Sequence, residues 1–480
     1  MKLGSQKFGT MTFPKDYDVL RVATLNKTDL AGGNNKFYQI EAHVSKDKKK
    51  FRLYSRYGRV GQEGMQEERV PDQDEASLLS AFDSLKAEKT KASKGYVEVK
   101  MAATKIGSAV TNAQILSDDV KKDKVKGEDE GDKKDEKTKL DIHDSVAKLV
   151  DRLYTEAGQA VRQQLSGSLN TSVENPLGTL TLTQIEHGRG ILQEIQQMIA
   201  DKPKLESTIH ADLIKKSNEF YSAIPQTIAH RPKPSEGKKA LDEWLATMVL
   251  NDAKRLDEKE DLLGLLSDVQ GMVKGFASTD VEKKYVEIGC EYTFLPKDDP
   301  SYKKISAFHQ ETRSDRHSWK ADIKNIWRVN IKGQREKHVA KMKEVGNVKP
   351  LFHGSGPQNI LGICKHGLLM RPPGVYITGS MFGNGLYFAD QSSKSEQYSF
   401  GRFGGGGGKA ETFFMFVTDV ALGTIKEYED AQTHLTKPPS GYHSVQGKKG
   451  RWLQHNEFIV YELKQHILQY LIEFKTNSRY

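Results

Sequence analysis

A charged segment in the first third of the chain is the strongest constraint on how it folds. Residues 121–139 read KKDKVKGEDEGDKKDEKTK and contain no aromatic residue and a single aliphatic one, Val125. Such a segment cannot bury enough apolar area to offset the entropy that ordering would cost. We therefore predict a disordered charged linker over about 106–141, which separates a small N-terminal domain from the rest of the chain.

The N-terminal part, residues 1–105, has the pattern of a small β-rich domain with one helix. FYQIEAHV (37–44) and FRLYSRYG (51–58) alternate apolar and polar residues around a polar turn, which predicts a hairpin. ASLLSAFDSLKAEKT (76–90) has helical spacing. This part carries 20 Lys and Arg against 14 Asp and Glu, a net charge of +6. That charge favours a polyanionic partner such as nucleic acid, with an ordinary lysine-rich surface as the alternative.

After the linker the apolar period becomes helical. In 142–165 the residues Ile142, Val146, Leu149 and Leu153 share one stripe, as in an amphipathic helix. The segments in which the same period continues are 182–199, 211–224, 238–256 and 261–273. We predict an all-α bundle over 142–275.

From residue 276 to 480 the period becomes two. Short β-type runs recur, namely VEIGCEYTFL, DIKNIWRVNI, GLYFA, ETFFMFVTDVAL, NEFIVYEL and YLIEFKT. They predict a mixed, β-rich domain, so the chain as a whole is expected to be an α+β multidomain protein. Cys290 and Cys364 have no partners at metal-ligand spacing, so no metal site is expected. No apolar run is long enough to cross a membrane, so we expect no membrane partner.

Three clusters in this last domain are candidates for chemistry. LFHGSGPQNILG (351–362) places His353 before a glycine, GNGLYFADQSSKSEQYS (383–399) spaces two tyrosines around a serine, and HNEFIVYEL (455–463) places Glu457 at a strand start. Taken singly, each has an ordinary structural explanation: a strand histidine, core packing with a solvated turn, and a carboxylate facing solvent. The cluster at 351–362 superficially resembles a dinucleotide-binding fingerprint. We reject a Rossmann site because Asn359 replaces the third glycine and the strand–helix context is unclear.

The order and spacing of the clusters resemble the catalytic domain of the poly(ADP-ribose) polymerases. TGSMFGNGLYFADQSSKSEQYS matches the family pattern along most of its length. ENPLGTLT (174–181) and SNEFYSAIP (217–225) resemble the family's autoinhibitory helical domain. YSRYGRVGQEG (54–64) resembles its Trp-Gly-Arg (WGR) nucleic-acid-binding domain, with tyrosine in place of tryptophan. The resemblance is to the smaller DNA-dependent members, and implies a WGR-like domain (1–105), the linker (106–141), the helical domain (142–275) and an ADP-ribosyltransferase domain (276–480).

The resemblance implies an enzyme that consumes NAD as a substrate and needs no metal. Glu457, His353 and Tyr387 would be the catalytic residues. The nicotinamide ring would lie between Tyr387 and Tyr398, and Glu457 would bond a hydroxyl of its ribose and orient the acceptor. The residues expected to contact NAD are His353, Gly354, Ser355, Arg371, Tyr387, Lys394, Ser395 and Tyr398.

The resemblance also implies partners and a mode of control. Tyr57, Gly58 and Arg59 would bind DNA at strand breaks, and DNA binding would loosen a helical domain that otherwise blocks NAD. Acceptors would be other proteins and the chain itself, with linker residues such as Ser117 and Glu128 as modification sites, and an accessory factor is a further candidate partner at the acceptor site. The location would be nuclear in a eukaryote and cytoplasmic or nucleoid otherwise.

Two departures from the family pattern lie near the acceptor side. Ser380 and His455 stand where the best-known members often have tyrosine. The presence of Glu457 favours polymer formation, since members that attach one unit often lack this glutamate. The alternatives are a mono-ADP-ribosyltransferase acting on protein or nucleic-acid ends, and an inactive DNA-end-binding scaffold.

Overall fold

The computed structural model contains two compact units. It describes residues 13–14, 17–62, 64–69, 74–101, 140–165, 180–201, 211–276, 278–370, 381–400 and 412–476. The first unit, unit 1, falls within residues 1–140 and 161–252, and the second, unit 2, within residues 141–160 and 253–480. The predicted linker and the automodification candidates Ser117 and Glu128 lie outside the described residues, except for the last two positions of the linker.

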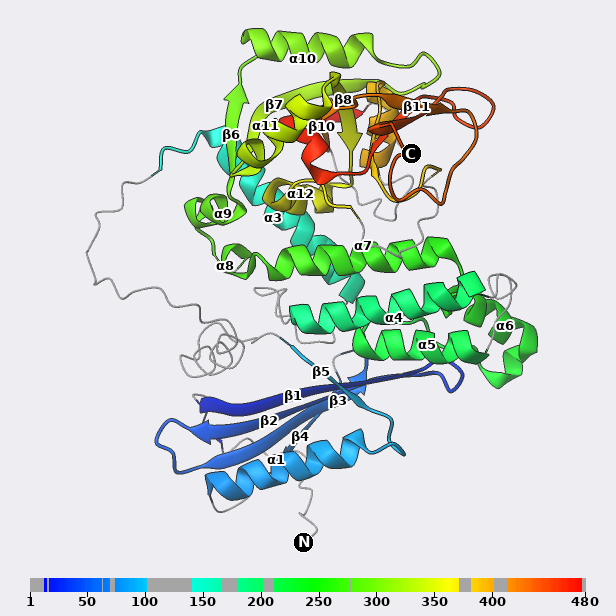
Figure 1. The fold of residues 1–480 in the computed structure, drawn as a ribbon. Coiled ribbons are helices and arrows are strands. Elements are labelled where there is room, and N and C mark those ends of the chain that lie inside the picture. Colours follow the sequence, from blue (N-terminus) through cyan, green and yellow to red (C-terminus); the bar gives the residue numbers. More distant parts are fainter. Residues whose placement is uncertain are drawn as a thin grey trace. The chain divides into compact units, whose positions relative to one another are not determined.

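Unit 1 contains a five-stranded antiparallel sheet with the order β4-β3-β2-β1-β5. Helix α1 (Glu75–Thr90) lies against this sheet (Figure 1) because Leu78, Phe82 and Leu85 recur on one face and bury there. The predicted hairpin and helix are confirmed. The strands are β1 (Tyr17–Asp29), β2 (Asn34–Ser45), β3 (Phe51–Arg59), β4 (Met65–Arg69) and β5 (Val97–Val99).

Unit 1 also contains α4 (Leu182–Asp201), α5 (Ala211–Ala223) and α6 (Gly237–Met248), the last preceded by the short 3₁₀ helix η2 (Pro234–Glu236). The described helices in the 142–275 region therefore divide between the two units. The predicted boundaries of a separate helical domain stay a prediction.

The prediction of one helix over 238–256 was wrong, because α6 ends at Met248 and the next helix starts at residue 253. Tertiary hydrogen bonds take up the backbone groups between them. The Tyr221 hydroxyl donates to the Met248 carbonyl oxygen at 2.9 Å, and the Leu250 N–H donates to the Ser217 hydroxyl oxygen at 2.9 Å. Leu250 is buried, so contacts with distant residues outweigh the local helical preference.

Unit 2 is built on two sheets, with the orders β6-β7-β14-β10-β8 and β11-β12-β13-β9. All described pairs are antiparallel except β11 with β12. The α+β prediction is confirmed. The strands are β6 (Cys290–Leu295), β7 (Ala321–Ile331), β8 (Val348–Gly354), β9 (Leu386–Phe388), β10 (Phe413–Ala421), β11 (Ile425–Tyr428), β12 (Ser444–Gly447), β13 (Glu457–Val460) and β14 (His466–Thr476).

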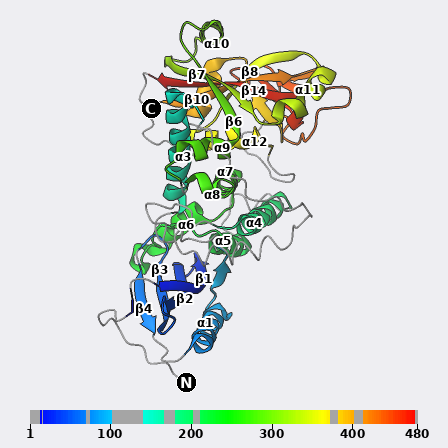
Figure 2. The same cartoon turned by 90° about the vertical axis from the view of Figure 1, so that its left-hand side faces the viewer.

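The α-helices assigned to unit 2 surround these sheets. The first part of α3 (Asp144–Leu165) runs beside the larger sheet (Figure 2), where the Arg152 guanidinium pairs with Glu473 at 2.5 Å. The other helices are α7 (Ala253–Gln270), α8 (Val273–Phe276), α9 (Val281–Ile288), α10 (Pro300–Glu311), α11 (Gln334–Val345), α12 (Ile360–His366) and α13 (Ser392–Ser399), with 3₁₀ turns η3 (Pro357–Asn359) and η4 (Leu463–Gln465). In the part of the chain that the structure describes, no helix could span a membrane.

One segment of unit 2 that was predicted to be a strand is helical in its first part and a strand only in its second part. The run VEIGCEYTFL was expected to be extended throughout, but its first residues complete α9. Gly289 ends that helix with a φ of 69°, a conformation that glycine adopts without steric cost. Strand β6 then begins at Cys290, so a single glycine decides where the helix stops and the strand starts.

Replacing Ser217 with alanine tests the tertiary break between α6 and α7. The variant leaves the buried Leu250 N–H without its acceptor, which costs about 1–2 kcal/mol. We expect the unfolding transition of unit 1 to fall by about 2–6 °C in scanning calorimetry of the full chain. Ser84→Ala, on the exposed face of α1, is the control and should leave the transition unchanged. An equal shift in both variants would contradict this account.

Candidate active site

The candidate site forms where the two sheets of unit 2 meet. A β-bridge joins Phe352 of β8 to Ala389, which follows β9: the Phe352 N–H donates to the Ala389 carbonyl oxygen at 2.8 Å, and the Ala389 N–H donates back at 3.0 Å. Strand β9 in turn pairs with β13, with Tyr387 opposite Ile459. These pairings bring together three segments that lie far apart in the sequence.

A pocket opens at this junction, and most of the predicted site residues line it. Tyr387 and Tyr398 both contribute to its wall, and Tyr398 is 42% exposed. Among the described residues, no group of three or more His, Cys, Asp or Glu is placed to hold a metal ion. The lining residues are Phe352, His353, Gly354, Tyr387, Phe388, Ala389, Lys394, Ser395, Tyr398 and Glu457.

Glu457 enters the pocket as a buried carboxylate that is held at one oxygen. Glu457 is the first residue of β13, an interior strand of its sheet that is buried on both faces. The residue is 8% exposed. Lys394 Nζ donates to Glu457 Oε1 at 2.7 Å, and burial lowers the pKa of Lys394 although Glu457 acts against that shift. Glu457 Oε2 is buried and has no hydrogen-bond partner among the described residues. It is therefore available to accept a hydrogen bond from a ligand.

His353 is oriented by a backbone carbonyl. Its Nδ1 lies 3.0 Å from the Tyr387 carbonyl oxygen, and because a carbonyl only accepts, Nδ1 donates. Burial lowers the pKa of His353, which outweighs the opposite effect of that hydrogen bond. The ring is therefore neutral at neutral pH, and its Nε2 carries a lone pair that can accept from a ligand hydroxyl.

The segment for which a solvated turn was the ordinary structural alternative is helix α13. Gly354 is required at the start of this site because α13 crosses directly over it: a Cβ at that position would lie 1.8 Å from the Ser395 carbonyl oxygen. We expected Gly354 to contact NAD. The structure shows that Gly354 also lies against the helix that carries Lys394, Ser395 and Tyr398.

Three further residues named in the sequence analysis, Ser355, Arg371 and Ser380, are not among the described residues that line the pocket. The Ser355 hydroxyl accepts from Asn359 Nδ2 at 3.2 Å, inside the turn that leads to α12. A strand–helix context does surround this turn, contrary to our prediction, but β8 pairs antiparallel with β10 and not in a parallel unit of the Rossmann type. Arg371 and Ser380 lie outside the described residues.

A buried carboxylate that the sequence did not single out anchors α13. Glu396 is 0% exposed and accepts from His309 Nε2 at 2.9 Å and from Trp319 Nε1 at 2.6 Å, with the Arg313 guanidinium 3.3 Å away. Burial raises its pKa, but these partners outweigh that effect and hold the pKa below its ordinary value. Its partners are at least 77 residues away, so no local pattern reveals them.

His455, two residues before Glu457, is a buried imidazole that does not line the pocket. It is 4% exposed, packs edge-on against His317 with ring centroids 4.9 Å apart, and neither ring nitrogen has a hydrogen-bond partner among the described residues. Burial and then the positive charges of neighbouring groups, including His317 and Lys394, lower its pKa to about 4. His455 is therefore a neutral, buried imidazole at neutral pH.

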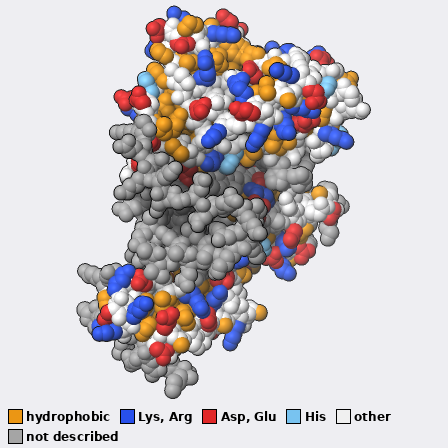
Figure 3. Space-filling model, turned by 60° about the vertical axis from the view of Figure 1, so that its left-hand side comes forward, with side chains coloured by type: hydrophobic (Ala, Val, Ile, Leu, Met, Phe, Trp, Pro, Cys, Tyr) orange, Lys and Arg blue, Asp and Glu red, His pale blue; other side chains and the backbone are white. Residues whose placement is uncertain are grey.

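The predicted nucleic-acid residues lie on the sheet of unit 1. Tyr57 stacks on Tyr38 with ring centroids 5.1 Å apart, and both line a surface hollow together with Lys36, Gly58, Arg59, Glu67, Lys89 and Tyr96. The Arg59 guanidinium donates to the carbonyl oxygens of Gly33 at 3.2 Å and Ile228 at 3.0 Å. Lys and Arg side chains are interspersed with Asp and Glu on the face drawn in Figure 3, so charge there is not gathered in one patch.

Models of three families match consecutive parts of the chain. They are the WGR domain (residues 21–103), the regulatory domain of poly(ADP-ribose) polymerase (141–286) and the poly(ADP-ribose) polymerase catalytic domain (300–452). The chain belongs to the poly(ADP-ribose) polymerase family. The match to the catalytic domain ends at residue 452, before Glu457. The assignment of Glu457 to the candidate site therefore depends on its position in the pocket and not on that match.

Known polymerases align along nearly the whole chain. Poly(ADP-ribose) polymerase 2 of Homo sapiens is 26% identical over 510 residues, which cover 96% of this chain and 80% of that protein. Poly(ADP-ribose) polymerase 1 of Arabidopsis thaliana is 26% identical over 94% of this chain, and that of Oryza sativa subsp. japonica is 28% identical over 95%. The chain spans about half the length of these two plant relatives, 46% and 47%.

Replacing Glu396 tests whether this carboxylate anchors the pocket helix. Glu396→Ala leaves buried donors unpaired and should destabilise unit 2 by about 3–5 kcal/mol, whereas Glu396→Gln keeps an acceptor oxygen and should cost less. Because the native pKa is lowered, the wild-type contribution is present above the ordinary pKa and is lost as pH falls through the native value. We expect thermal unfolding at pH 7 and pH 3 to differ less for Glu396→Gln than for the wild type. Glu429→Gln, at an exposed position, is the control.

Proposed function

We propose that the chain is a DNA-activated ADP-ribosyltransferase that cleaves NAD, releases nicotinamide and extends poly(ADP-ribose) on protein acceptors, including itself. The observation that carries the proposal is the buried Glu457 carboxylate in the wall of a pocket with two tyrosines. Lys394 fixes one of its oxygens, and the other has no hydrogen-bond partner among the described residues. Membership of the polymerase family supports the proposal that NAD is the substrate. In a eukaryote we propose a nuclear role in the response to DNA damage.

The pocket residues fit a flat, amide-bearing ring and a ribose. Tyr387 and Tyr398 offer aromatic faces, and the Tyr387 hydroxyl is fixed by donation to the Gly383 carbonyl oxygen at 2.8 Å. Gly354 and Ser395 supply backbone groups and a hydroxyl for the carboxamide. His353 Nε2 would accept from a hydroxyl of the adenosine ribose, because its other nitrogen is committed to Tyr387.

Glu457 would act on the bond between ribose and nicotinamide. Breaking that bond places positive charge on the ribose, and a carboxylate aimed at it in a dry pocket stabilises the charge where it develops. The nicotinamide leaves as a neutral molecule and needs no acid. Glu457 Oε2 would hold the ribose hydroxyl, and the hydrogen bond from Lys394 to Oε1 keeps the carboxylate in place.

DNA control would act through the hydrogen bonds that join the sheet of unit 1 to α5. Asn26 Nδ2 donates to the carbonyl oxygens of Tyr221 at 2.9 Å and Ser222 at 3.2 Å, and the Thr28 N–H donates to the Ser222 hydroxyl oxygen at 2.9 Å. Arg59 extends this set to Ile228. We propose that Tyr57, Gly58 and Arg59 form part of a surface for broken DNA, whose occupation would change these contacts and shift the helices toward an open state.

A second contact supports a helical gate within unit 2. The Asp268 carboxyl of α7 packs directly on Gly362 of α12, where a Cβ would lie 1.8 Å from Asp268 Oδ2. Helix α12 follows the strand and turn that carry His353 and Ser355. Burial raises the pKa of Asp268 to about 6, so ionisation weakens this contact as pH rises through that value.

Release of nicotinamide with and without broken DNA tests the proposed reaction. We expect DNA ends to raise the rate, with strong dependence on salt because phosphates are contacted. Glu457→Gln should bind NAD nearly normally and lose chain elongation by about 10²–10³-fold. Undiminished polymer from that variant would refute the role of Glu457. Product limited to single units in the wild type would favour the mono-transferase alternative, and no release of nicotinamide would favour the scaffold.

Asn26→Ala tests the proposed coupling. The variant removes both hydrogen bonds from the side-chain amide to carbonyl oxygens in the last turn of α5, so we expect stimulation by DNA to fall several-fold while affinity for DNA, measured by anisotropy, changes little. Thr90→Ala, at the exposed end of α1, is the matched control. Full stimulation in the Asn26 variant would show that DNA binding is transmitted by another route.

A further inference from the structure

The connection between β12 and β13 is a fixed turn that presents an aromatic side chain outward. Leu453 is buried in the core beside Phe382 and Ile459, and the Gly450 N–H donates to the Leu453 carbonyl oxygen at 2.8 Å. The Lys449 N–H donates to Asn456 Oδ1 at 2.9 Å. Contacts on both sides therefore fix the direction in which the residue before Leu453 points.

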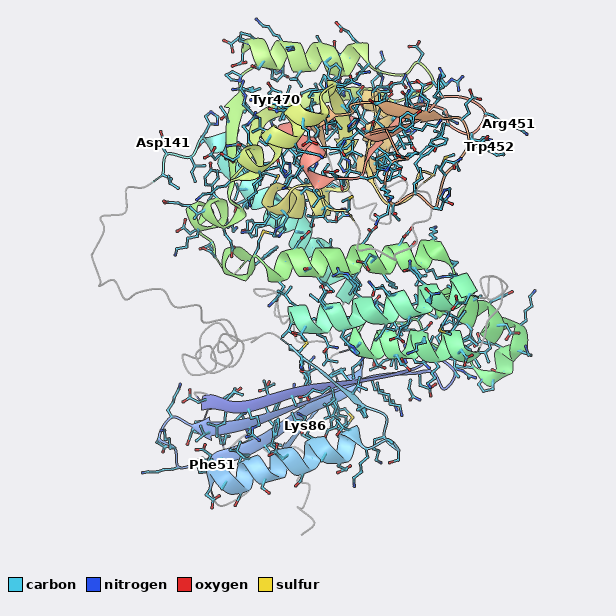
Figure 4. The ribbon with its side chains drawn as sticks, in the orientation of Figure 1. Phe51, Lys86, Asp141, Arg451, Trp452 and Tyr470 are labelled. Carbon is cyan, nitrogen blue, oxygen red and sulfur yellow. The ribbon has the colours of Figure 1, made fainter. Side chains whose placement is uncertain are left out.

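That residue is Trp452, which is 60% exposed. The Arg451 guanidinium lies over its ring, 5.1 Å from the centroid, and Figure 4 shows both side chains at the outer edge of unit 2. Indole is among the side chains that bury most area in contacts, so an exposed ring held in place suggests a binding surface. An indole with a guanidinium beside it suits a ligand that combines planar rings with negative charge.

The surroundings of the turn are positive. Lys448 is paired with Glu427 at 2.9 Å, whereas the exposed Lys449 and Arg451 have no ion pair among the residues that the structure describes. The positive charges of Lys394, Lys449 and Arg316 act on the neighbouring His455. The turn therefore offers cations next to an aromatic platform.

The turn is tied to the wall of the candidate site. Asn456, which accepts from Lys449, donates from Nδ2 to Asp390 Oδ2 at 2.8 Å, and the Asn456 carbonyl oxygen accepts from Lys394 Nζ at 3.2 Å. Glu457 is the fifth residue after Trp452, so their Cα atoms lie within about 18 Å of each other. A ligand chain that reaches Glu457 from this side passes close to the turn.

We propose that the turn formed by Lys449, Arg451 and Trp452 is a binding subsite for the ADP-ribose chain under extension, with Trp452 stacking on an adenine and the cations near a pyrophosphate. This inference rests on the proposed function, because that function supplies a product with one adenine and two phosphates per unit. The position in unit 2, tied to the Glu457 wall, favours this chain over nucleic acid. The subsite retains the end of the chain between additions and so sets chain length.

The length of the poly(ADP-ribose) product, compared at equal consumption of NAD, tests the subsite in the full-length protein. With labelled NAD and broken DNA, products are compared on denaturing gels at the same amount of nicotinamide released. We expect shorter and more numerous chains from Trp452→Ala and Arg451→Ala, by about threefold or more in mean length, and near-normal chains from Trp452→Phe. Lys343→Ala, at an exposed position in α11, is the charge-matched control. Normal lengths from both alanine variants would overturn the proposal.

A binding measurement separates this inference from the proposed function. Anisotropy of a labelled ADP-ribose oligomer is measured against an oligodeoxynucleotide of equal charge. We expect Trp452→Ala to weaken binding of the oligomer by about 5- to 100-fold and binding of the oligodeoxynucleotide much less. A larger loss for the oligodeoxynucleotide, or no loss for either, would overturn the subsite. A wild type that releases no nicotinamide would refute the proposed function, and the binding measurement would still decide whether the subsite exists.

Discussion

The ion pair between Lys394 and Glu457 is the contact on which the candidate site depends. It joins helix α13 to strand β13 at 2.7 Å inside the protein, where removing one partner leaves a buried charge uncompensated. The same lysine also donates to the carbonyl oxygen of Asn456. One side chain thus fixes the carboxylate, the strand that carries it and the turn before that strand.

This arrangement needs support from behind the helix. Glu396, one residue after Ser395, faces away from the pocket into a buried set of donors formed by His309, Arg313 and Trp319. The helix is therefore held by one carboxylate on each side: Glu457 binds its lysine, and its own Glu396 binds α10 and the segment that follows α10. The hydrogen bonds and ion pairs that these buried carboxylates form hold the pocket helix in one place.

The resemblance of three separate clusters to the polymerase catalytic domain named residues that the structure brings together. His353, Tyr387, Lys394, Tyr398 and Glu457 all line one pocket, and their roles toward NAD are a proposal. The structural need for glycine at position 354 could not be predicted, because the backbone that lies against it belongs to α13, which is distant in sequence. Glu396 was missed because its hydrogen-bond partners are also distant in sequence. Arg59 was expected to bind DNA, and in the structure its guanidinium donates to backbone carbonyl oxygens.

The sequence by itself determined the class of fold and the hairpin and helix of the N-terminal domain, because periodicity and residue type act locally. Only the tertiary structure decided where helix 238–256 breaks, since Ser217 and Tyr221 capture its backbone groups. Only the tertiary structure decided that the segment after Tyr387 becomes a helix crossing Gly354. Both outcomes depend on hydrogen bonds and packing between residues distant in the chain, which no local pattern encodes.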